Sequence, residues 1–332
     1  MDFYNFRKIW NPDWFQGNHR HRNYFEGWYF KLVSPDKGAS FAIIPGISIG
    51  EGIQSAYAFI QVINGKTGES RFVKFSITDF SFSREGFEVS IAGNKFSGKG
   101  ISIDLPKAGF GVSGRIYFHD PVPYPVTIIS PGVMGWYRFV PTMECYHGIV
   151  SMLHTLQGNL TISGESVDFT DGKGYIEKDW GKSMPLAWIW MQSNHFKQDD
   201  LSISFSIANI PWRKSSFTGF LIILSAGDRI YRFTTYTGAK INQLSLNDGL
   251  IEMEVSNRKY ILSVSARGNV KGNLKAPVDG EMSRTIHESI DSSIRISMCE
   301  KNGKILVEGI GDPAGLEVAG NVKILQRDLG IC

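Results

Sequence analysis

The segment GYIEKDWGKSMPLAWIWMQSNHF, residues 174–196, joins a charged half to an aromatic half. The first half places Glu177, Lys178 and Asp179 in succession and closes with Trp180. In an extended strand successive side chains point to opposite faces, so Glu177 and Asp179 share one face with Tyr175 while Lys178 points the other way. This half therefore predicts a strand with two neighbouring carboxylates on one face.

The second half, from Ala187 to Phe196, alternates in the same way if it is extended. One face then carries Trp188, Trp190, Gln192 and Asn194. Gly181 and Pro185 bracket a turn between the halves, which predicts two strands. These strands would bring the carboxylates close to the tryptophan side chains and so form a pocket. The alternative is that the tryptophans are core and that Lys178 offsets the acids at a strand edge.

Outside this segment the chain consists of short alternating or β-branched runs separated by Gly, Asn, Asp and Ser. A run every ~8–12 residues with almost no helical periodicity is typical of an antiparallel all-β fold. The proline-rich segment 120–135 is predicted to be a crossing loop or lid, and 272–290 a short helix or irregular excursion. The predicted strands are 24–33, 40–44, 56–63, 71–77, 86–91, 101–105, 112–118, 201–210, 217–225, 229–236, 249–255, 259–266, 293–300, 304–309 and 316–324.

The composition of the chain excludes several classes of protein. The chain has 332 residues, 42% hydrophobic and 13% aromatic, with a net charge of +3 and no basic run beyond HRHR at 19–22. A nucleic-acid partner is therefore not expected. No segment has the length of a signal peptide core or of a membrane span, so we expect a cytoplasmic protein, with peripheral membrane contact left open. Three cysteines without paired spacing predict neither disulfides nor a zinc site.

Candidate chemical groups also occur before the central segment. Glu26 interrupts the apolar run 24–33, and a buried carboxylate must be paired or neutralised, so it is a candidate acid or a salt-bridged strand glutamate. If 143–148 is extended, Cys145 and His147 share one face and Glu144 and Tyr146 the other. No recognised metal motif includes these histidines, and no metal is predicted.

Several separated blocks resemble, in the same order, the signature segments of the tocopherol cyclase family. These blocks are EGWYF at 26–30, the glutamate-aromatic segment at 143–148, YIEKDWGKSMPLAWIWMQSNHF at 175–196, LKAPVDGEM at 274–282 and GLEVAGN at 315–321. The resemblance is to a bacterial-type member related to lipocalin-like carotenoid hydratase and AttH-type proteins, without a plastid transit segment. It implies an all-β fold of two lipocalin-like antiparallel β-barrel halves, residues 23–165 and 166–332, after an N-terminal extension, 1–22.

The resemblance also implies a chemistry, because plant members of the family close a chromanol ring by adding a phenolic oxygen across a prenyl double bond. We expect a cofactor-independent cyclase, of the isomerase class, that acts on an apolar isoprenoid or phenolic substrate. Such an addition needs a general acid, a shielded cation and a positioned hydroxyl. The alternative is a lipocalin-like carrier that binds a hydrophobic molecule without changing it.

The resemblance and the spacing together assign roles. Asp179 is the expected proton donor, its pKa raised by burial beside Trp180, with Glu177 or Glu26 as its partner. His147 orients or deprotonates the hydroxyl, and Glu144 completes the set of acids. The expected cavity lining is aromatic and amide, namely Trp28, Tyr146, Trp180, Trp188, Trp190, Gln192 and Asn194.

Overall fold

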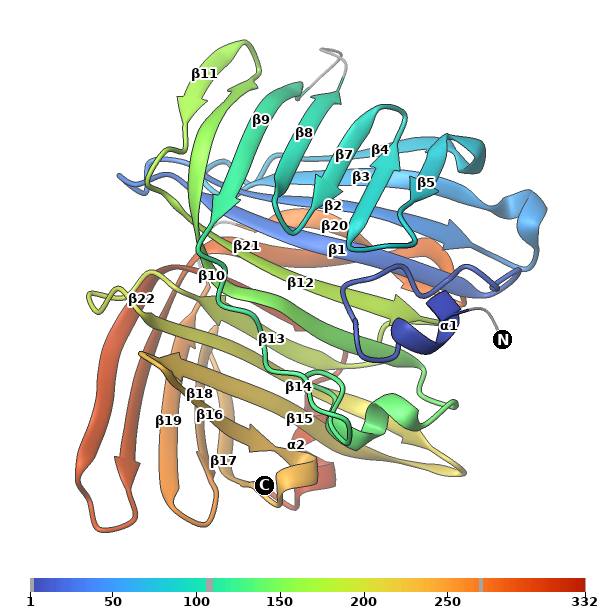
Figure 1. The fold of residues 1–332 in the computed structure, drawn as a ribbon. Coiled ribbons are helices and arrows are strands. Elements are labelled where there is room, and N and C mark those ends of the chain that lie inside the picture. Colours follow the sequence, from blue (N-terminus) through green and yellow to red (C-terminus); the bar gives the residue numbers. More distant parts are fainter. Residues whose placement is uncertain (1–2, 106–109, 269–270, 332) are drawn as a thin grey trace. The chain divides into compact units, whose positions relative to one another are not determined.

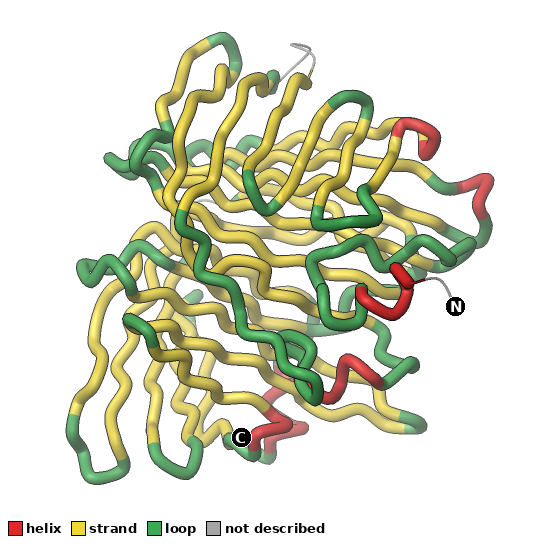
Figure 2. Tube along the Cα trace, in the orientation of Figure 1, coloured by secondary structure: helices red, strands yellow, loops and turns green. Residues whose placement is uncertain are grey.

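The structure is a computed structural model that describes residues 3–105, 110–268 and 271–331. Strands dominate the chain, as Figure 2 shows in yellow, which confirms the predicted all-β fold with very little helix. Within the described ranges, the α-helices are α1 (Phe3–Arg7) and α2 (Lys323–Leu329), and the 3₁₀ turns are η1 (Ile53–Ser55), η2 (Ile77–Asp79), η3 (Gly135–Phe139) and η4 (Thr235–Thr237).

The first sheet has twelve antiparallel strands among the described residues (Figure 1). At its centre β12 pairs with β1 on one side and β10 on the other, and β11 pairs with β10 away from the main path. In pairing order the strands are β4 (Ser70–Ser76), β3 (Tyr57–Asn64), β2 (Ser40–Ile49), β1 (Tyr24–Val33), β12 (Lys173–Gly181), β10 (Cys145–Ile162), β9 (Val112–His119), β8 (Gly100–Leu105), β7 (Asn94–Ser97), β6 (Glu88–Ile91) and β5 (Phe80–Phe82), with β11 (Glu165–Asp168).

The second sheet has ten antiparallel strands in the part of the chain that the structure describes. Here β13 pairs with β14 and β22, and β20 pairs with β21 off the main path. In pairing order the strands are β16 (Arg229–Thr234), β15 (Ser215–Ala226), β14 (Leu201–Trp212), β13 (Trp188–Ser193), β22 (Ile305–Ala319), β21 (Glu281–Glu300), β19 (Tyr260–Arg267), β18 (Leu250–Ser256) and β17 (Lys240–Asn247), with β20 (Gly272–Val278).

The chain forms two compact units, and their boundary differs from the one predicted from the sequence. The first unit holds residues 1–184 and 272–286, and the second holds 185–271 and 287–332. The prediction divided the chain after residue 165, but β12 pairs with β1 and β10 and so belongs to the first unit. Residues 272–286 return to the first unit, where the side chain of Gln61 on β3 hydrogen-bonds both main-chain groups of Lys275 on β20. The N-terminal segment is also part of this unit.

The core of the first unit is aromatic. Phe30 on β1 lies 5.9 Å from Phe96 on β7 and 6.0 Å from Phe118 on β9, measured between ring centroids. Because β1 and β7 are far apart in pairing order, their contact shows that the sheet curls and encloses these rings. We call the face toward Phe30 the inner face and the opposite one the outer face. Burying each ring contributes roughly 1.5–3 kcal/mol.

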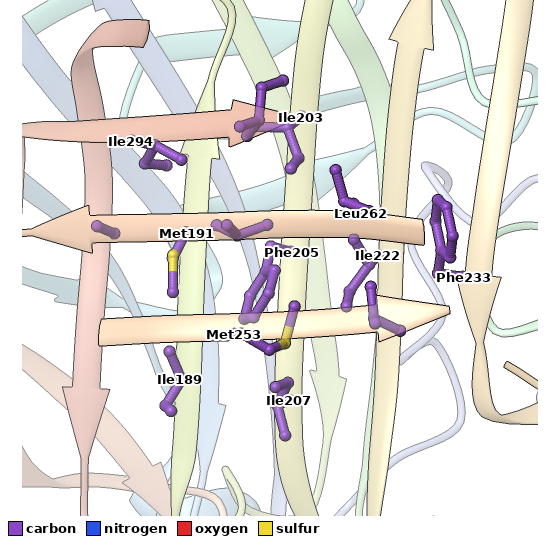
Figure 3. Close-up of a cluster of buried hydrophobic side chains, with 14 of the residues drawn as sticks. Ile189, Met191, Ile203, Phe205, Ile207, Ile222, Phe233, Met253, Leu262 and Ile294 are labelled. Carbon is purple, nitrogen blue, oxygen red and sulfur yellow. The ribbon is translucent and has the colours of Figure 1, made fainter. Parts of the chain in front are cut away.

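The second unit has an aliphatic core, shown in Figure 3. Alternate residues of its strands point inward, including Ile189 and Met191 on β13 and Phe205 on β14. They pack with side chains such as Met253 on β18 and Ile294 on β21. The residues between them on β13, Trp188 and Trp190, therefore lie on the opposite face of that strand.

Two sequence predictions about local structure are wrong. Residues 272–290 form β20 and the beginning of β21 rather than a helix or irregular excursion. Their turn is Asp279-Gly280, with φ of +49° and +86°, which suits a tight hairpin between twisted strands. The predicted strand 316–324 ends at Ala319, because Gly320 has φ of +73° and a Cβ there would lie 1.9 Å from the Leu186 carbonyl oxygen.

Most predicted strands are confirmed, and the predicted loop 120–135 contains no strand or helix until Gly135, where η3 begins. Cys145 and Cys299 are free thiols, whereas Cys332 lies outside the described residues. None of the helices in the described ranges combines the length and the apolar character that a membrane crossing requires.

Candidate functional site

The candidate site is built on β12 and its neighbour β10. The predicted alternation holds: Tyr175, Glu177 and Asp179 share the outer face of β12, while Lys178 and Trp180 share the inner face. His147 on β10 lies directly opposite Asp179 in the antiparallel register. Since directly opposed side chains in such a pair lie about 5 Å apart at Cβ, this register brings the imidazole within reach of both carboxylates.

On the outer face these side chains form a line, which we call the His147 cluster: Asp179, His147, Glu177 and Tyr175. His147 Nδ1 lies 2.9 Å from Asp179 Oδ1, and His147 Nε2 lies 3.7 Å from Glu177 Oε2. The Tyr175 hydroxyl donates a 2.6 Å hydrogen bond to Glu177 Oε2. The cluster thus places four proton-carrying groups in a row across two strands, with a gap of 3.7 Å between His147 and Glu177.

The charge state of His147 follows from competing effects. Burial lowers its pKa, but the charges of Asp179 and Glu177 and the hydrogen bond to Asp179 outweigh it and raise the pKa from 6.5 to about 9. At neutral pH the imidazole is therefore protonated. Its Nε2 is buried and, within the described structure, has no hydrogen-bond partner, because Glu177 Oε2 at 3.7 Å is beyond that range. The Nε2–H is therefore a buried donor that no acceptor among the described residues uses.

Among the described residues, His147, Glu177 and Asp179 are also a group that could hold a metal ion. His147, Glu177 and Asp179 offer one nitrogen and two oxygens within 4.8 Å of one another. However, Nδ1 of His147 is already hydrogen-bonded to Asp179 at 2.9 Å. A metal would have to take the place of the proton at one imidazole nitrogen, since metal ligands bind in the neutral form. The sequence-based prediction of no metal remains a prediction.

Glu26 lies on the inner face in a fully bonded environment. Its carboxylate accepts from the main-chain N–H of Gln16 at 2.8 Å and of Gly17 at 2.9 Å, and from the Tyr24 hydroxyl at 2.5 Å. It also pairs with Lys178 Nζ at 2.6 Å, with both side chains completely buried. These contacts favour the salt-bridged alternative over the candidate acid, because they use the lone pairs of both oxygens.

Lys178 completes this buried pair. Its ammonium group donates to the main-chain oxygen of Pro12 at 2.9 Å and to that of Trp14, and lies 4.7 Å and 4.8 Å from the ring centroids of Trp28 and Trp180. Burial lowers the pKa of Lys178 to about 8, against the opposing effect of its carboxylate partner. The pair fixes the N-terminal segment to the inner face of the first sheet.

The aromatic candidates of the first unit also belong to the inner face. Trp180 stacks on Tyr146 at 5.5 Å with an interplanar angle of 10°, and the guanidinium of Arg138 lies over both rings. Trp28 Nε1 donates to the main-chain oxygen of Asp13. Because adjacent residues point to opposite faces, the expectation that Asp179 is buried beside Trp180 is wrong. Its near neighbour is His147 instead.

Glu144 precedes β10 and lies near the charged pair formed by Lys182 and Asp279. Partial burial raises the pKa of its carboxyl group, with Lys182 lowering and Asp279 raising it. Its main-chain oxygen accepts from the N–H of Lys182. Glu144 thus supports the turn that follows β12. The last residue of β12, Gly181, has φ of +150°, and a Cβ added there would lie 2.3 Å from the main-chain oxygen of Glu144.

The remaining predicted residues belong to the second unit. Trp188 Nε1 donates a 2.7 Å hydrogen bond to Glu317 Oε2 on the neighbouring strand β22. Gly315 on the same strand leaves room for the Trp190 ring, since a Cβ there would come within 2.5 Å of it. Gln192 and Asn194 are buried as well. Trp188, Trp190 and Gln192 lie on one face of β13, as predicted. However, β12 and β13 are in different sheets and do not form a hairpin.

Sequence reasoning left two residues out of the site. Tyr175 shares the face of Glu177 by simple alternation, so the signal for it was present in the sequence. Arg138 carried no such signal. It reaches Gln16 with a 2.6 Å hydrogen bond that joins two segments 122 residues apart.

Comparison with known proteins gives a consistent result. Residues 125–320 match the family model described as tocopherol cyclase-like. The chain is 24% identical over 197 residues to the chloroplastic tocopherol cyclase of Zea mays, covering 56% of this chain and 41% of that protein. It is 23% identical over 206 residues to a probable chloroplastic tocopherol cyclase of Oryza sativa subsp. japonica, covering 59% and 44%. The match thus spans less than half the length of these curated relatives.

Solved structures agree with the fold. The crystal structure of CghA with Sch210972 superposes with a TM-score of 0.55 at 12% identity, covering 90% of this chain and 89% of that chain. A putative AttH from Nitrosomonas europaea gives 0.51 at 11% identity, covering 90% and 92%. The lipocalin-like all-β fold expected from the sequence is therefore confirmed.

Proposed function

This chain belongs to the tocopherol cyclase-like family, and on that basis we propose that it is a cofactor-independent intramolecular cyclase of the isomerase class. It would add a hydroxyl group across an alkene of one apolar isoprenoid or phenolic molecule. The proposed compartment is the cytoplasm. Support comes from the curated relatives, which are named tocopherol cyclases, and from the chemistry of the His147 cluster.

The observation that carries the proposal is the position of His147 between two carboxylates, 2.9 Å from Asp179 and 3.7 Å from Glu177. An imidazolium held in one orientation by a carboxylate on Nδ1 keeps its other N–H as an acid. A second carboxylate beside that nitrogen can act as a base. One acid and one base on the same face are the pair that addition of O–H to C=C requires.

These groups allow a closed proton cycle. His147 Nε2–H gives its proton to one alkene carbon, and the substrate hydroxyl forms the new C–O bond at the other carbon. The hydroxyl proton passes to the Glu177 carboxylate, and from Glu177 Oε2 it returns to His147 Nε2. Substrate and product then have the same atoms, and the protein ends in its starting state.

Asp179 and Tyr175 have supporting roles in this cycle. Asp179 orients the imidazole and favours its protonated form, which replaces the sequence-based assignment of Asp179 as proton donor. Tyr175 donates to Glu177 and keeps that carboxylate turned toward His147. Glu26 takes no part, because its oxygens are engaged on the inner face.

The proposal is tested by incubating the protein with a prenylated hydroquinone and separating the products by chromatography and mass spectrometry. We expect a product of unchanged mass and altered retention. His147→Gln should abolish its formation, whereas His119→Gln, at an exposed histidine of the same unit, should not. If apolar molecules from the source organism bind the wild-type protein and are recovered unaltered, the protein is a carrier and the proposal fails.

A further inference from the structure

A group of large apolar side chains is exposed on the first unit. They come from the N-terminal segment around α1 and from the loop and 3₁₀ turn before β10 (Figure 1). Ile128 and Ile129 are 81% and 79% exposed, and Phe6 is 53% exposed. We call the following set the apolar patch: the exposed Phe6, Ile128, Ile129, Trp136 and Phe139, together with the half-buried Trp10.

Contacts between the two segments make the patch continuous. The Trp10 ring lies 5.0 Å from that of Phe6 and 6.3 Å from that of Phe139, measured between centroids. Trp10 Nε1 also donates to the main-chain oxygen of Ile128 at 3.1 Å. Segments more than 110 residues apart in sequence therefore present one surface. Single exposed hydrophobic residues need no explanation, but a contiguous set marks a contact surface.

The patch is held in place by the inner-face contacts described above. The buried pair of Glu26 and Lys178 binds the main chain of residues 12–17. Arg138, inside η3, hydrogen-bonds Gln16 and so ties the second segment to the first. Both segments are thus anchored to the folded unit, and their exposed side chains do not have the freedom of a loose terminus.

The net charge of the two segments that form the patch is positive. Residues 3–22 and 120–140 contain five basic residues, Arg7, Lys8, Arg20, Arg22 and Arg138, against two acidic ones, Asp13 and Asp120. The exposed basic run 19–22 lies beside α1, because His19 Nε2 contacts the Asn5 amide at 2.7 Å. Exposed apolar side chains with a basic border match the surface of an anionic bilayer, where aromatic rings lie at the headgroup level.

We propose that the apolar patch docks the protein onto a membrane that contains anionic lipids. The isoleucine pair enters the acyl boundary, the aromatic rings lie among the headgroups, and the exposed Arg20 and Arg22 bind lipid phosphates. A protein partner would be expected to supply acidic side chains to these arginines, but it offers no separate reason for the exposed Ile128-Ile129 tip. The inference does not depend on the reaction proposed above.

Vesicle sedimentation tests the proposal, with vesicles of phosphatidylcholine alone and of an equimolar mixture with phosphatidylglycerol. We expect binding to the mixed vesicles that weakens as salt is added. Changing Ile128→Asp and Ile129→Asp together should lower the vesicle partition coefficient by about tenfold or more. These side chains are exposed, so the fold should persist, which circular dichroism can verify.

The matched control is Ile305→Asp, at an isoleucine of β22 that is 59% exposed and outside the patch. It should bind vesicles as the wild type does. Equal binding of the Ile128/Ile129 variant and the wild type would overturn the proposal. So would a wild-type protein that stays in the supernatant with both kinds of vesicle but self-associates through the patch, which would instead assign this surface to a protein contact.

Discussion

His147 Nδ1 lies 2.9 Å from Asp179 Oδ1 across the antiparallel pair of β10 and β12. The Asp179 carboxylate fixes the orientation of the His147 imidazole and stabilises its protonated form. A second carboxylate, Glu177, lies 3.7 Å from the other ring nitrogen. The chemistry proposed for this chain rests on that arrangement.

The first prediction concerns stability and pH. The pKa of His147 is raised from 6.5 to about 9, so between these values the folded protein holds a proton that the unfolded chain has lost. Stability from this pair is therefore complete below pH 6.5 and decreases as pH rises toward 9. We expect Asp179→Asn to remove much of that decrease, on the order of 1–3 kcal/mol.

The measurement is the free energy of unfolding by urea at several pH values between 6.5 and 8. Above pH 8 the titration of Lys178 has the opposite effect on the free energy of unfolding, because its pKa is lowered from 10.5 to about 8. Histidine NMR titration of the wild type should locate a site that titrates near 9. A wild-type and variant protein with parallel pH profiles would contradict the assigned pairing.

The second prediction concerns Tyr175. Tyr175→Phe removes the 2.6 Å hydrogen bond to Glu177 while keeping the ring that is buried at this position. A hydrogen bond to a charged group contributes about 1.5–3 kcal/mol, so we expect a fall in kcat of roughly tenfold to a hundredfold. Steady-state kinetics with a prenylated hydroquinone measure it. An unchanged kcat in the folded variant would exclude Tyr175 from the cycle.

The third prediction separates structure from catalysis. Glu26→Gln leaves the fully buried Lys178 without its counter-ion, and losing one partner of such a pair costs about 3–5 kcal/mol. We expect lower stability and faster proteolysis within residues 3–22, with the folded fraction still active. Chemical denaturation and limited proteolysis provide the readouts.

The matched control for Glu26 is Asp279→Asn, which breaks the exposed pair with Lys182 at 2.7 Å. Exposed pairs contribute about 0–1 kcal/mol, so this variant should unfold almost as the wild type does. If both variants lost the same stability, burial of the Glu26 pair would not be what stabilises the N-terminal segment.

The fourth prediction concerns metal ions. Because His147 carries a proton in the proposed cycle, activity should survive exhaustive dialysis against a chelator and should not rise when zinc or manganese is added back. Metal analysis of the active protein accompanies this assay. Activity lost on chelation and restored by one metal would assign His147, Glu177 and Asp179 to an ion instead.

Local alternation was enough to predict the faces of the two central strands. Strand β12 separates Glu177 from Lys178, and β13 separates Trp190 from Met191, because an extended backbone requires it. The pairing of His147 with Asp179 could not be predicted, since it depends on the register between strands that are distant in sequence. Sequence reasoning could place both residues in a site but could not decide which was the acid.

Other differences have equally specific causes. Glu26 allowed two interpretations until its partner Lys178 was located on the neighbouring strand. The hairpin at Asp279-Gly280 has a local turn signal in its Asp-Gly pair, and both residues have positive φ. The return of residues 272–286 to the first unit has no local signature at all, because it depends on contacts such as that between Gln61 and Lys275.

The most direct test of the central claim is to run the reaction of a prenylated hydroquinone in heavy water. If a proton from the His147 cluster is added to the alkene, the cyclised product gains one deuterium on carbon, and His147→Gln forms no such product while His119→Gln does. A cyclised product without deuterium on carbon, or equal labelling by the His147 variant, would contradict the account.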